Sequence, residues 1–226
     1  MLNRQKPMWS KKQPRLKGTR KAEKRRPYGE MKLHIIWEYG NIIPVTGGGE
    51  RMDRGLVHIY CGDGKGKTTA ATGLAVRAAG CGKKVLFARF LKNENSGELR
   101  VLEQIPEIDV MHPEQSHGFY WTLDEGQKAK AREVYRRFWD AIQGKIRAGG
   151  YFMLVMDEFM AAYRYGFIPS EEALELLKEN PQGLEIILTG RDPAEELAAL
   201  ADYVSEISKV KHPFDRGIRA RRGIEY

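Results

Sequence analysis

The stretch GDGKGKTT at residues 62–69 decides the fold of this 226-residue chain. It follows a short apolar run, 56–61, typical of a strand buried in a parallel sheet. It leads into residues 67–79, which are rich in Ala, contain no Pro and end before Gly80, as expected of a helix. Backbone N–H groups of such a loop, with the N-terminus of the helix, can surround phosphate oxygens. The pattern therefore predicts a binding site for the triphosphate of a nucleotide.

Two residues of this loop have individual roles in the prediction. Lys67 should place a positive charge on the phosphates, and the hydroxyl of Thr68 should be a ligand of Mg²⁺ or Mn²⁺. The strict P-loop pattern has Gly five residues before Gly66, where this chain has Cys61, so the match is a variant. We expect the whole loop to bind ATP, namely Gly62, Asp63, Gly64, Lys65, Gly66, Lys67, Thr68 and Thr69.

An acidic pair, Asp157-Glu158, follows a second apolar run at 152–156. Carboxylate oxygens at the end of a strand beside a P-loop suit Mg²⁺, so Asp157 is the expected second metal ligand. Glu158 is expected to act as an orienting group or a base, and with Lys67 and Asp157 it completes the predicted catalytic group. The alternative is a solvated turn at the end of a strand.

Strands and helices alternate along the chain. Further apolar runs at 85–90 and 184–188 predict strands, and periodic apolar residues predict a long amphipathic helix over 124–147. Thr122 with Glu125 suggests a capping box for that helix, and Asp192-Pro193 suggests a second helix start. The predicted fold is α/β and P-loop NTPase-like, with a mainly parallel sheet, helices on both faces and ligands at the carboxyl ends of the strands.

The N-terminal residues 1–51 differ in composition from the rest. They carry 13 Lys or Arg against 4 Asp or Glu, which accounts for all of the net charge of +8. Such an extension could contact nucleic acid or an acidic partner, could be a disordered tail, or could result from a start site upstream of the true one at Met31 or Met52. We place the domain boundary near residue 52 and assign 52–226 to one domain.

The composition favours a cytoplasmic protein. No run approaches the roughly 20 apolar residues that span a bilayer, and the basic N-terminus lacks the apolar core of a secretory signal. Two cysteines, Cys61 and Cys81, are too few for a disulfide framework. We therefore expect no membrane partner, and nothing beyond the basic N-terminal extension favours nucleic acid.

Six segments together resemble the P-loop type of ATP:corrinoid adenosyltransferase. The similarity covers about 54–226 and keeps the order of the family's motifs. The stretch from 188 to 226 is the most specific part, since ordinary P-loop ATPases have no such ending. The segments are GDGKGKTTAA from Gly62, the Asp157-Glu158 pair, LTGR at 188–191, ADYVSE at 201–206, VKHPF at 210–214 and RGIEY at 222–226.

The resemblance implies transfer of the 5′-deoxyadenosyl group of ATP to Co(I) of a reduced corrinoid, with release of triphosphate, in adenosylcobalamin biosynthesis or salvage. The cobalt is the nucleophile, so no protein nucleophile is needed. Lys67, the loop amides and a metal held by Thr68 and Asp157 would stabilise the leaving triphosphate, and Arg191 would reach phosphate. The family also implies an electron-donating flavoprotein as partner and a homodimer.

The family's aromatic motif matches the segment 118–121. By analogy, Phe119 and Trp121 would press on the lower face of the corrin and displace its axial ligand. The alternative is that these aromatics simply pack under a loop. The chain departs from the family at Tyr120, where Thr is common, and at Asn93, where Gly is usual.

Two other functions remain open from sequence. One is a P-loop ATPase or kinase that acts on another small molecule. The other is a nucleic-acid-associated NTPase that uses the basic residues of 1–51.

Overall fold

A computed structural model describes residues 54–91, 96–115, 120–180 and 183–225. The strands are β1 (Val57–Cys61), β2 (Val85–Arg89), β3 (Ile108–Met111), β4 (Met153–Asp157), β5 (Glu185–Thr189) and β6 (Tyr203–Glu206). The α-helices are α1 (Lys67–Gly80), α2 (Gly97–Leu102), α3 (Glu125–Ala148), α4 (Phe159–Arg164), α5 (Ser170–Glu179) and α6 (Glu195–Leu200). Two short 3-10 helices are η1 (Tyr120–Thr122) and η3 (Pro213–Arg216).

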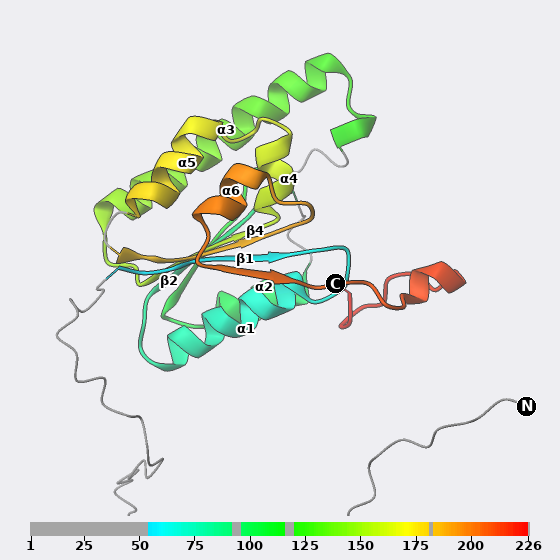
Figure 1. The fold of residues 1–226 in the computed structure, drawn as a ribbon, viewed down its shortest axis with the longest axis horizontal. Coiled ribbons are helices and arrows are strands. Elements are labelled where there is room, and N and C mark those ends of the chain that lie inside the picture. The colour runs from blue at the N-terminus through cyan, green and yellow to red at the C-terminus, as the bar shows by residue number, and fades with distance from the viewer. Residues whose placement is uncertain (1–53, 92–95, 116–119, 181–182, 226) are drawn as a thin grey trace, which may run out of the picture. The chain divides into compact units, whose positions relative to one another are not determined.

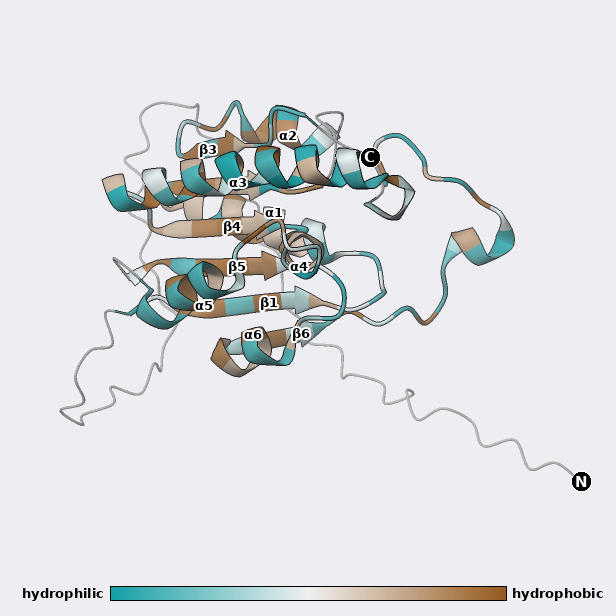
Figure 2. Cartoon of the chain, turned by 90° about the horizontal axis from the view of Figure 1, so that it is seen from above, coloured by the Kyte–Doolittle hydropathy of each residue, from teal (hydrophilic) through white to brown (hydrophobic). Residues whose placement is uncertain are grey.

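Within these residues the six strands form one sheet in the order β3-β2-β4-β5-β1-β6, and all neighbours are parallel. Figure 2 shows β3, β4, β5, β1 and β6 in this order across the molecule, with much of β4 and β5 coloured as hydrophobic. Helices cover both faces: α3, α4, α5 and α6 lie on one, and α1 lies on the other (Figure 1). The predicted fold class is confirmed.

Alternation along each strand explains the two faces. In β2, Leu86 and Ala88 belong to the core beneath α3, whereas Val85 and Phe87 belong to the core shared with α1 and α2. Successive side chains of a strand point to opposite faces, so a strand that is apolar at every position must be covered on both. Arg89 continues the Val85 and Phe87 series and so belongs to the face of α1.

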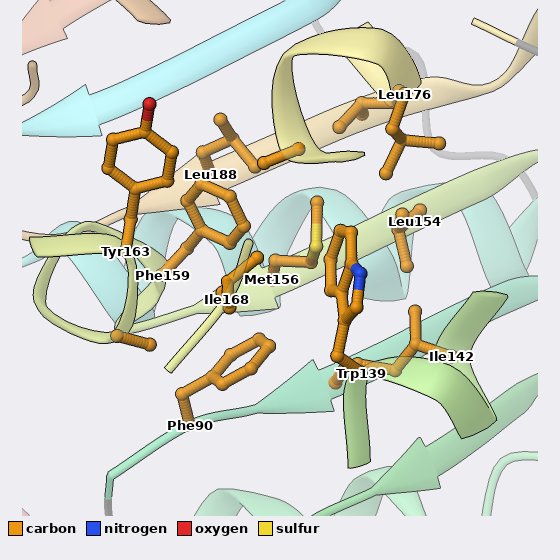
Figure 3. Close-up of a cluster of buried hydrophobic side chains, with 14 of the residues drawn as sticks. Phe90, Trp139, Ile142, Leu154, Met156, Phe159, Tyr163, Ile168, Leu176 and Leu188 are labelled. Atoms are coloured by element: carbon orange, nitrogen blue, oxygen red, sulfur yellow. The ribbon is translucent and has the colours of Figure 1, made fainter. Parts of the chain in front are cut away.

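The larger core lies under α3 and is rich in aromatic rings. Trp139 is fully buried there, and its Nε1 donates a hydrogen bond to Glu172 Oε2 at 2.8 Å. Figure 3 shows Trp139 beside Met156 of β4, with Phe90 and Phe159 nearby. Each fully buried large apolar side chain contributes about 1.5–3 kcal/mol. This core holds β4, and therefore Asp157 at its end, in a fixed position.

The smaller core brings α1 close to the sheet. The buried residues of α1 are all alanines, Ala71, Ala75, Ala78 and Ala79, and the helix packs on β1, β2, β4 and β5. Because alanine has a short side chain, the helix axis can approach the strands closely. The N-terminus of α1 consequently sits directly at the carboxyl ends of the strands.

The long helix lies where it was expected, but two predicted helix caps are wrong. The N-cap of α3 is Asp124, in a reciprocal capping box with Gln127, because Thr122 is already part of η1. The helix expected at Asp192 begins at Glu195 with Ala194 as N-cap. Asp192 has a φ of 48°, and its carbonyl accepts a hydrogen bond from Arg164 instead. A neighbouring local box replaces the first predicted cap, and a contact with α4 accompanies the loss of the second.

Several predictions about the chain lie outside the described residues. The boundary near residue 52 and the extension 1–51 belong to this group, so the division into domains stays a prediction. No helix in the described ranges combines the length and the apolar character needed to cross a bilayer. Cys61 is buried and Cys81 exposed, and both are free thiols.

Gly190, directly after β5, offers a test of the packing near the site. It has a φ of 148°, and a Cβ there would lie 2.5 Å from Met160 Cβ of α4. Gly190→Ala should therefore lower the free energy of unfolding by at least about 2 kcal/mol in urea denaturation. Gly144→Ala on exposed α3, where a Cβ meets nothing within 4 Å, should raise it by about 0.5–1 kcal/mol. Equal effects of the two variants would contradict the packing described.

Candidate functional site

A cavity of about 830 Å³ lies at the carboxyl ends of the strands. The loop residues 63–69 line it, together with Arg89, Glu98, Glu158 and Arg191 from other segments. Eight of the predicted site residues thus share one cavity with Arg191. Gly62 is absent from its wall, and Asp157 is fully buried behind it.

At two positions of the loop, a neighbouring segment of the chain leaves no space for a side chain. Gly62 has a φ of 101°, and a Cβ there would lie 2.5 Å from the carbonyl oxygen of Ile207. Gly64 would meet the same oxygen at 2.6 Å, and its N–H donates to it at 2.7 Å. Ile207 follows β6, so the extension of β6 holds the loop in shape. The sequence suggested that these glycines let the main chain approach phosphate. In the structure, the nearest atoms to the missing side chains belong to the backbone of Ile207.

The N-terminus of α1 opens into the cavity without a side-chain cap. Its N-cap is Gly66, with a φ of 129°, and no acidic residue lies in the first turn. The positive end of the helix dipole at this N-terminus therefore suits an anion. Lys67 Nζ donates to the carbonyl of Gly64 at 2.8 Å, which places its ammonium inside the curve of the loop.

Asp157 connects three elements at the base of the cavity. Its Oδ1 accepts hydrogen bonds from Thr68 Oγ1 at 2.8 Å and from Thr189 Oγ1 at 2.7 Å. Adjacent ligands of an octahedral Mg²⁺ with bonds of about 2.0–2.1 Å are separated by about 3 Å. The spacing of the Thr68 and Asp157 oxygens therefore fits two adjacent positions of such an ion.

Glu158 lies in an uncommon backbone conformation at the cavity wall. Its φ is 60° and its ψ 24°, in the left-handed region, where it caps the start of α4. Its N–H donates to Thr189 Oγ1 at 3.0 Å, which fixes the turn. This conformation costs a residue with a Cβ about 1–2 kcal/mol. Such outliers concentrate at functional sites.

The C-terminal segment forms part of the cavity wall, which sequence reasoning did not anticipate. Gly223, Ile224 and Glu225 line the cavity, and Glu225 Oε1 lies 3.4 Å from Lys65 Nζ. The side chain of Arg221 and then its backbone N–H lower the pKa of Glu225 from 4.5 to about 2. The predicted ATP-binding residue Lys65 therefore contacts the C-terminal segment.

Asp63 and Arg191 lie on the rim. Asp63 Oδ1 accepts a hydrogen bond from the backbone N–H of Lys209 at 2.8 Å. That bond, with the nearby charges of Lys209 and Arg191, lowers the pKa of the Asp63 carboxyl. Asp63 thus connects the loop to the extension of β6, while Arg191 presents its side chain to the cavity.

Sequence reasoning also missed Arg89, the last residue of β2. It pairs in register with Asp157 of β4 and is 2% exposed. Its Nε lies 3.5 Å from Asp157 Oδ2, and its Nη1 lies 3.2 Å from Glu98 Oε1. A charged residue at the end of an otherwise apolar strand was the signal that could have found it.

The predicted corrinoid contacts are outside what the structure describes. Phe119 falls in the undescribed stretch 116–119, and of Trp121 only the backbone, in η1, is described. Between them, Tyr120 stacks on Tyr165 with ring centroids 4.2 Å apart. The roles of Phe119 and Trp121 stay predictions.

Residues 53–226 match the protein family described as ATP:corrinoid adenosyltransferase BtuR/CobO/CobP. The chain belongs to this family. The match confirms the resemblance inferred from the motifs and the enzyme class that goes with it.

Curated relatives agree with this family. The corrinoid adenosyltransferase of Escherichia coli K12 is 38% identical over 178 residues, which cover 77% of this chain and 87% of the relative. Corrinoid adenosyltransferase CobA of Salmonella typhimurium is 36% identical, with the same coverage. The corrinoid adenosyltransferase of Pseudomonas aeruginosa is 31% identical over 179 residues, covering 78% of this chain and 86% of the relative.

Solved structures show more distant likeness. ATPases 2 and 3 of EssC from Geobacillus thermodenitrificans align with a TM-score of 0.42 and 17% identity, covering 76% of this chain and 35% of that one. A KaiC-like protein from Pyrococcus horikoshii aligns with a TM-score of 0.38 and 19% identity, covering 67% of this chain and 71% of that one.

The strain at Glu158 can be measured directly. Glu158→Gly should be more stable than Glu158→Ala by about 1 kcal/mol in urea unfolding, because glycine adopts the left-handed conformation without a Cβ clash. Both variants lack the carboxylate, so the difference isolates the backbone. Equal stabilities would show that the turn is not strained.

The contact of Arg221 with Glu225, within the C-terminal segment, can be tested by pH. The folded pKa of Glu225 lies below 4.5, so the interaction is fully present above pH 4.5 and is lost as pH falls through about 2. Titration of the Glu225 carboxyl by NMR should give a midpoint near 2. In Arg221→Gln the midpoint should return toward 4.5. A midpoint near 4.5 in the unmodified protein would contradict the contact.

Proposed function

We propose that the chain transfers the 5′-deoxyadenosyl group of ATP to Co(I) of a reduced corrinoid and releases triphosphate, in adenosylcobalamin biosynthesis or salvage. The supporting observation is the hydrogen bond from Thr68 to Asp157 at the uncapped start of α1, in a chain of the corrinoid adenosyltransferase family. A triphosphate site of this kind serves the reaction by holding the leaving group.

The reaction assigns a clear task to the protein. The electron pair of reduced cobalt forms the bond to C5′ of the ribose, and the C5′–O bond breaks with its electron pair on the triphosphate. Negative charge therefore grows on phosphate oxygens. Lys67 and the N–H groups of α1 would stabilise that charge, and fixed dipoles in a partly enclosed site are effective at this.

A Mg²⁺ or Mn²⁺ ion fits the same site. Thr68 and Asp157 would hold it, with phosphate oxygens and water as its other ligands, which is the usual pattern for Mg²⁺ beside a nucleotide. No cluster of three His, Cys, Asp or Glu side chains that could hold a metal occurs in the described residues. When bound, the ion would add Lewis-acid stabilisation of the leaving phosphates.

Glu158 is better suited to orientation than to proton transfer. The alkyl transfer removes no proton from the substrates, so it needs no general base. A carboxylate on the cavity wall can accept hydrogen bonds from the ribose hydroxyls and set the direction of C5′. Arg191 and Lys65 would contact phosphate from the rim.

The nucleophile would come from the corrinoid. Cys61 is the thiol next to the loop, and burial and the charge of Glu206 raise its pKa, which favours the unreactive neutral form. Phe119 and Trp121 would contact the corrin. A flavoprotein electron donor, a homodimer and a cytoplasmic location complete the proposal on the basis of the family.

The transfer can be tested under anaerobic, strongly reducing conditions with ATP and cobalamin. We expect equal amounts of triphosphate and of light-sensitive cobalt–carbon product. Lys67→Ala should lower kcat/KM at least about 100-fold, since it removes a cation from the leaving group. Lys178→Ala, exposed near the end of α5, is the control and should leave the rate unchanged.

Products of a different kind would contradict the proposal. Formation of ADP and phosphate without a cobalt–carbon bond would assign the chain to phosphoryl transfer. If Lys67→Ala were as active as the control, the loop lysine would have no role in the transfer.

A further inference from the structure

Arg89 is the one basic residue with a buried side chain in the described ranges 54–91, 96–115, 120–180 and 183–225. It ends β2 beside Asp157, on the face of the sheet that α1 covers. Taking a cation out of water costs several kcal/mol unless other groups compensate for it. Burial of a charged side chain at the wall of a cavity therefore needs a physical explanation.

Two carboxylates compensate the charge of Arg89 but leave Nε and Nη1 without a hydrogen bond. Asp157 Oδ2 is 3.5 Å from Nε, and Glu98 Oε1 is 3.2 Å from Nη1. Neither contact has hydrogen-bond geometry, and Nε and Nη1 have no hydrogen-bond partner within the described chain. A buried donor without a partner costs about 1–3 kcal/mol. The guanidinium is therefore held by charge while its directional donors stay available.

The two carboxylates differ in their freedom to move. Asp157 is fully buried and receives two threonine hydroxyls. Glu98 is 29% exposed and lies on α2, a helix of six residues. Glu98 is consequently the partner that an incoming anion could displace, and its departure would uncover Nη1 of Arg89.

We propose that Arg89 binds a phosphoryl group of the triphosphate, exchanging its contact with Glu98 for phosphate oxygens. The inference rests on the proposed function, since the ligand is the triphosphate of that reaction. A guanidinium always carries its charge and presents two parallel N–H groups that match two oxygens of one phosphate. Arg89 would thus act from the β2 side of the cavity, and Lys67 with the start of α1 from the β1 side.

Binding of inorganic tripolyphosphate, measured by calorimetry in the presence of EDTA, tests this without corrinoid or metal. Arg89→Gln should weaken the affinity about 10- to 100-fold, the usual effect of losing charge-assisted hydrogen bonds. Arg89→Lys keeps the positive charge but lacks the paired N–H groups of the guanidinium, so its affinity for tripolyphosphate should fall less. Arg100→Gln removes an equal charge from an exposed site on α2 and should bind as the unmodified protein does.

EDTA separates two roles of Arg89. If the residue acted only by orienting Asp157 toward a metal, Arg89→Gln would weaken tripolyphosphate binding with Mg²⁺ present but not in EDTA. Weakening of similar size in both conditions is the expected result. An effect confined to Mg²⁺ would overturn the proposal.

Glu98→Gln provides a variant whose expected effect is a gain. Removing the carboxylate 3.2 Å from Arg89 Nη1 should tighten tripolyphosphate binding several-fold, a change that misfolding cannot produce. In the Arg89→Gln background the same substitution should have a smaller effect, because the competition for Arg89 is gone. The proposed exchange of Glu98 for phosphate would be wrong if Glu98→Gln had the same effect in both backgrounds. It would also be wrong if Glu98→Gln had no effect in the otherwise unmodified protein.

The outcomes also separate this inference from the proposed function. If Lys67→Ala abolishes tripolyphosphate binding and Arg89→Gln leaves it unchanged, Arg89 is not a phosphate ligand and the transfer reaction stands. If the unmodified protein does not bind tripolyphosphate, the triphosphate site and the role of Arg89 are both wrong.

Discussion

The hydrogen bond from Thr68 to Asp157 is the constraint around which the site is organised. It joins the first turn of α1 to the end of β4, two segments 89 residues apart. The alanine face of α1 makes this contact reachable, and the aromatic core under α3 fixes the strand that carries Asp157. Thr189 shares the same carboxylate oxygen. Three elements meet at this one buried oxygen. A small displacement of any of them would therefore separate Lys67, at the start of α1, from Asp157 at the end of β4.

The loop shows how one sequence pattern serves both fold and chemistry. Contacts with the backbone of Ile207 require Gly62 and Gly64 to lack a side chain, whereas Gly66 opens the helix N-terminus toward the cavity. The glycines therefore attach the loop to the extension of β6 on one side and leave donors for phosphate on the other. In the proposed reaction these donors hold a leaving group, so the same geometry that serves phosphoryl transfer elsewhere would serve alkyl transfer to cobalt.

Local patterns predicted what local physics determines. The apolar runs of β1, β2, β4 and β5, the helix after the loop and the long helix α3 all follow from periodicity, and the structure confirms them. The cap at Thr122 was wrong because a second local box, Asp124 with Gln127, forms instead. The cap at Asp192 was wrong because Arg164 of a distant segment binds that turn. Some side chains of the site could not be predicted because they depend on distant segments. Arg89 and Glu225 were missed for the same reason, since each reaches the cavity only after the sheet and the C-terminal segment are assembled.

The position of bond cleavage in ATP tests the central claim most directly. ATP can carry a heavy isotope of oxygen at the atom that joins ribose C5′ to the α-phosphate, and mass spectrometry can follow that atom into the products. If the loop holds a leaving triphosphate, the label will appear in the released triphosphate and the adenosyl group on cobalt will carry none. Label retained in a nucleotide product, with free phosphate or diphosphate unlabelled, would show cleavage between phosphorus and oxygen and contradict the account.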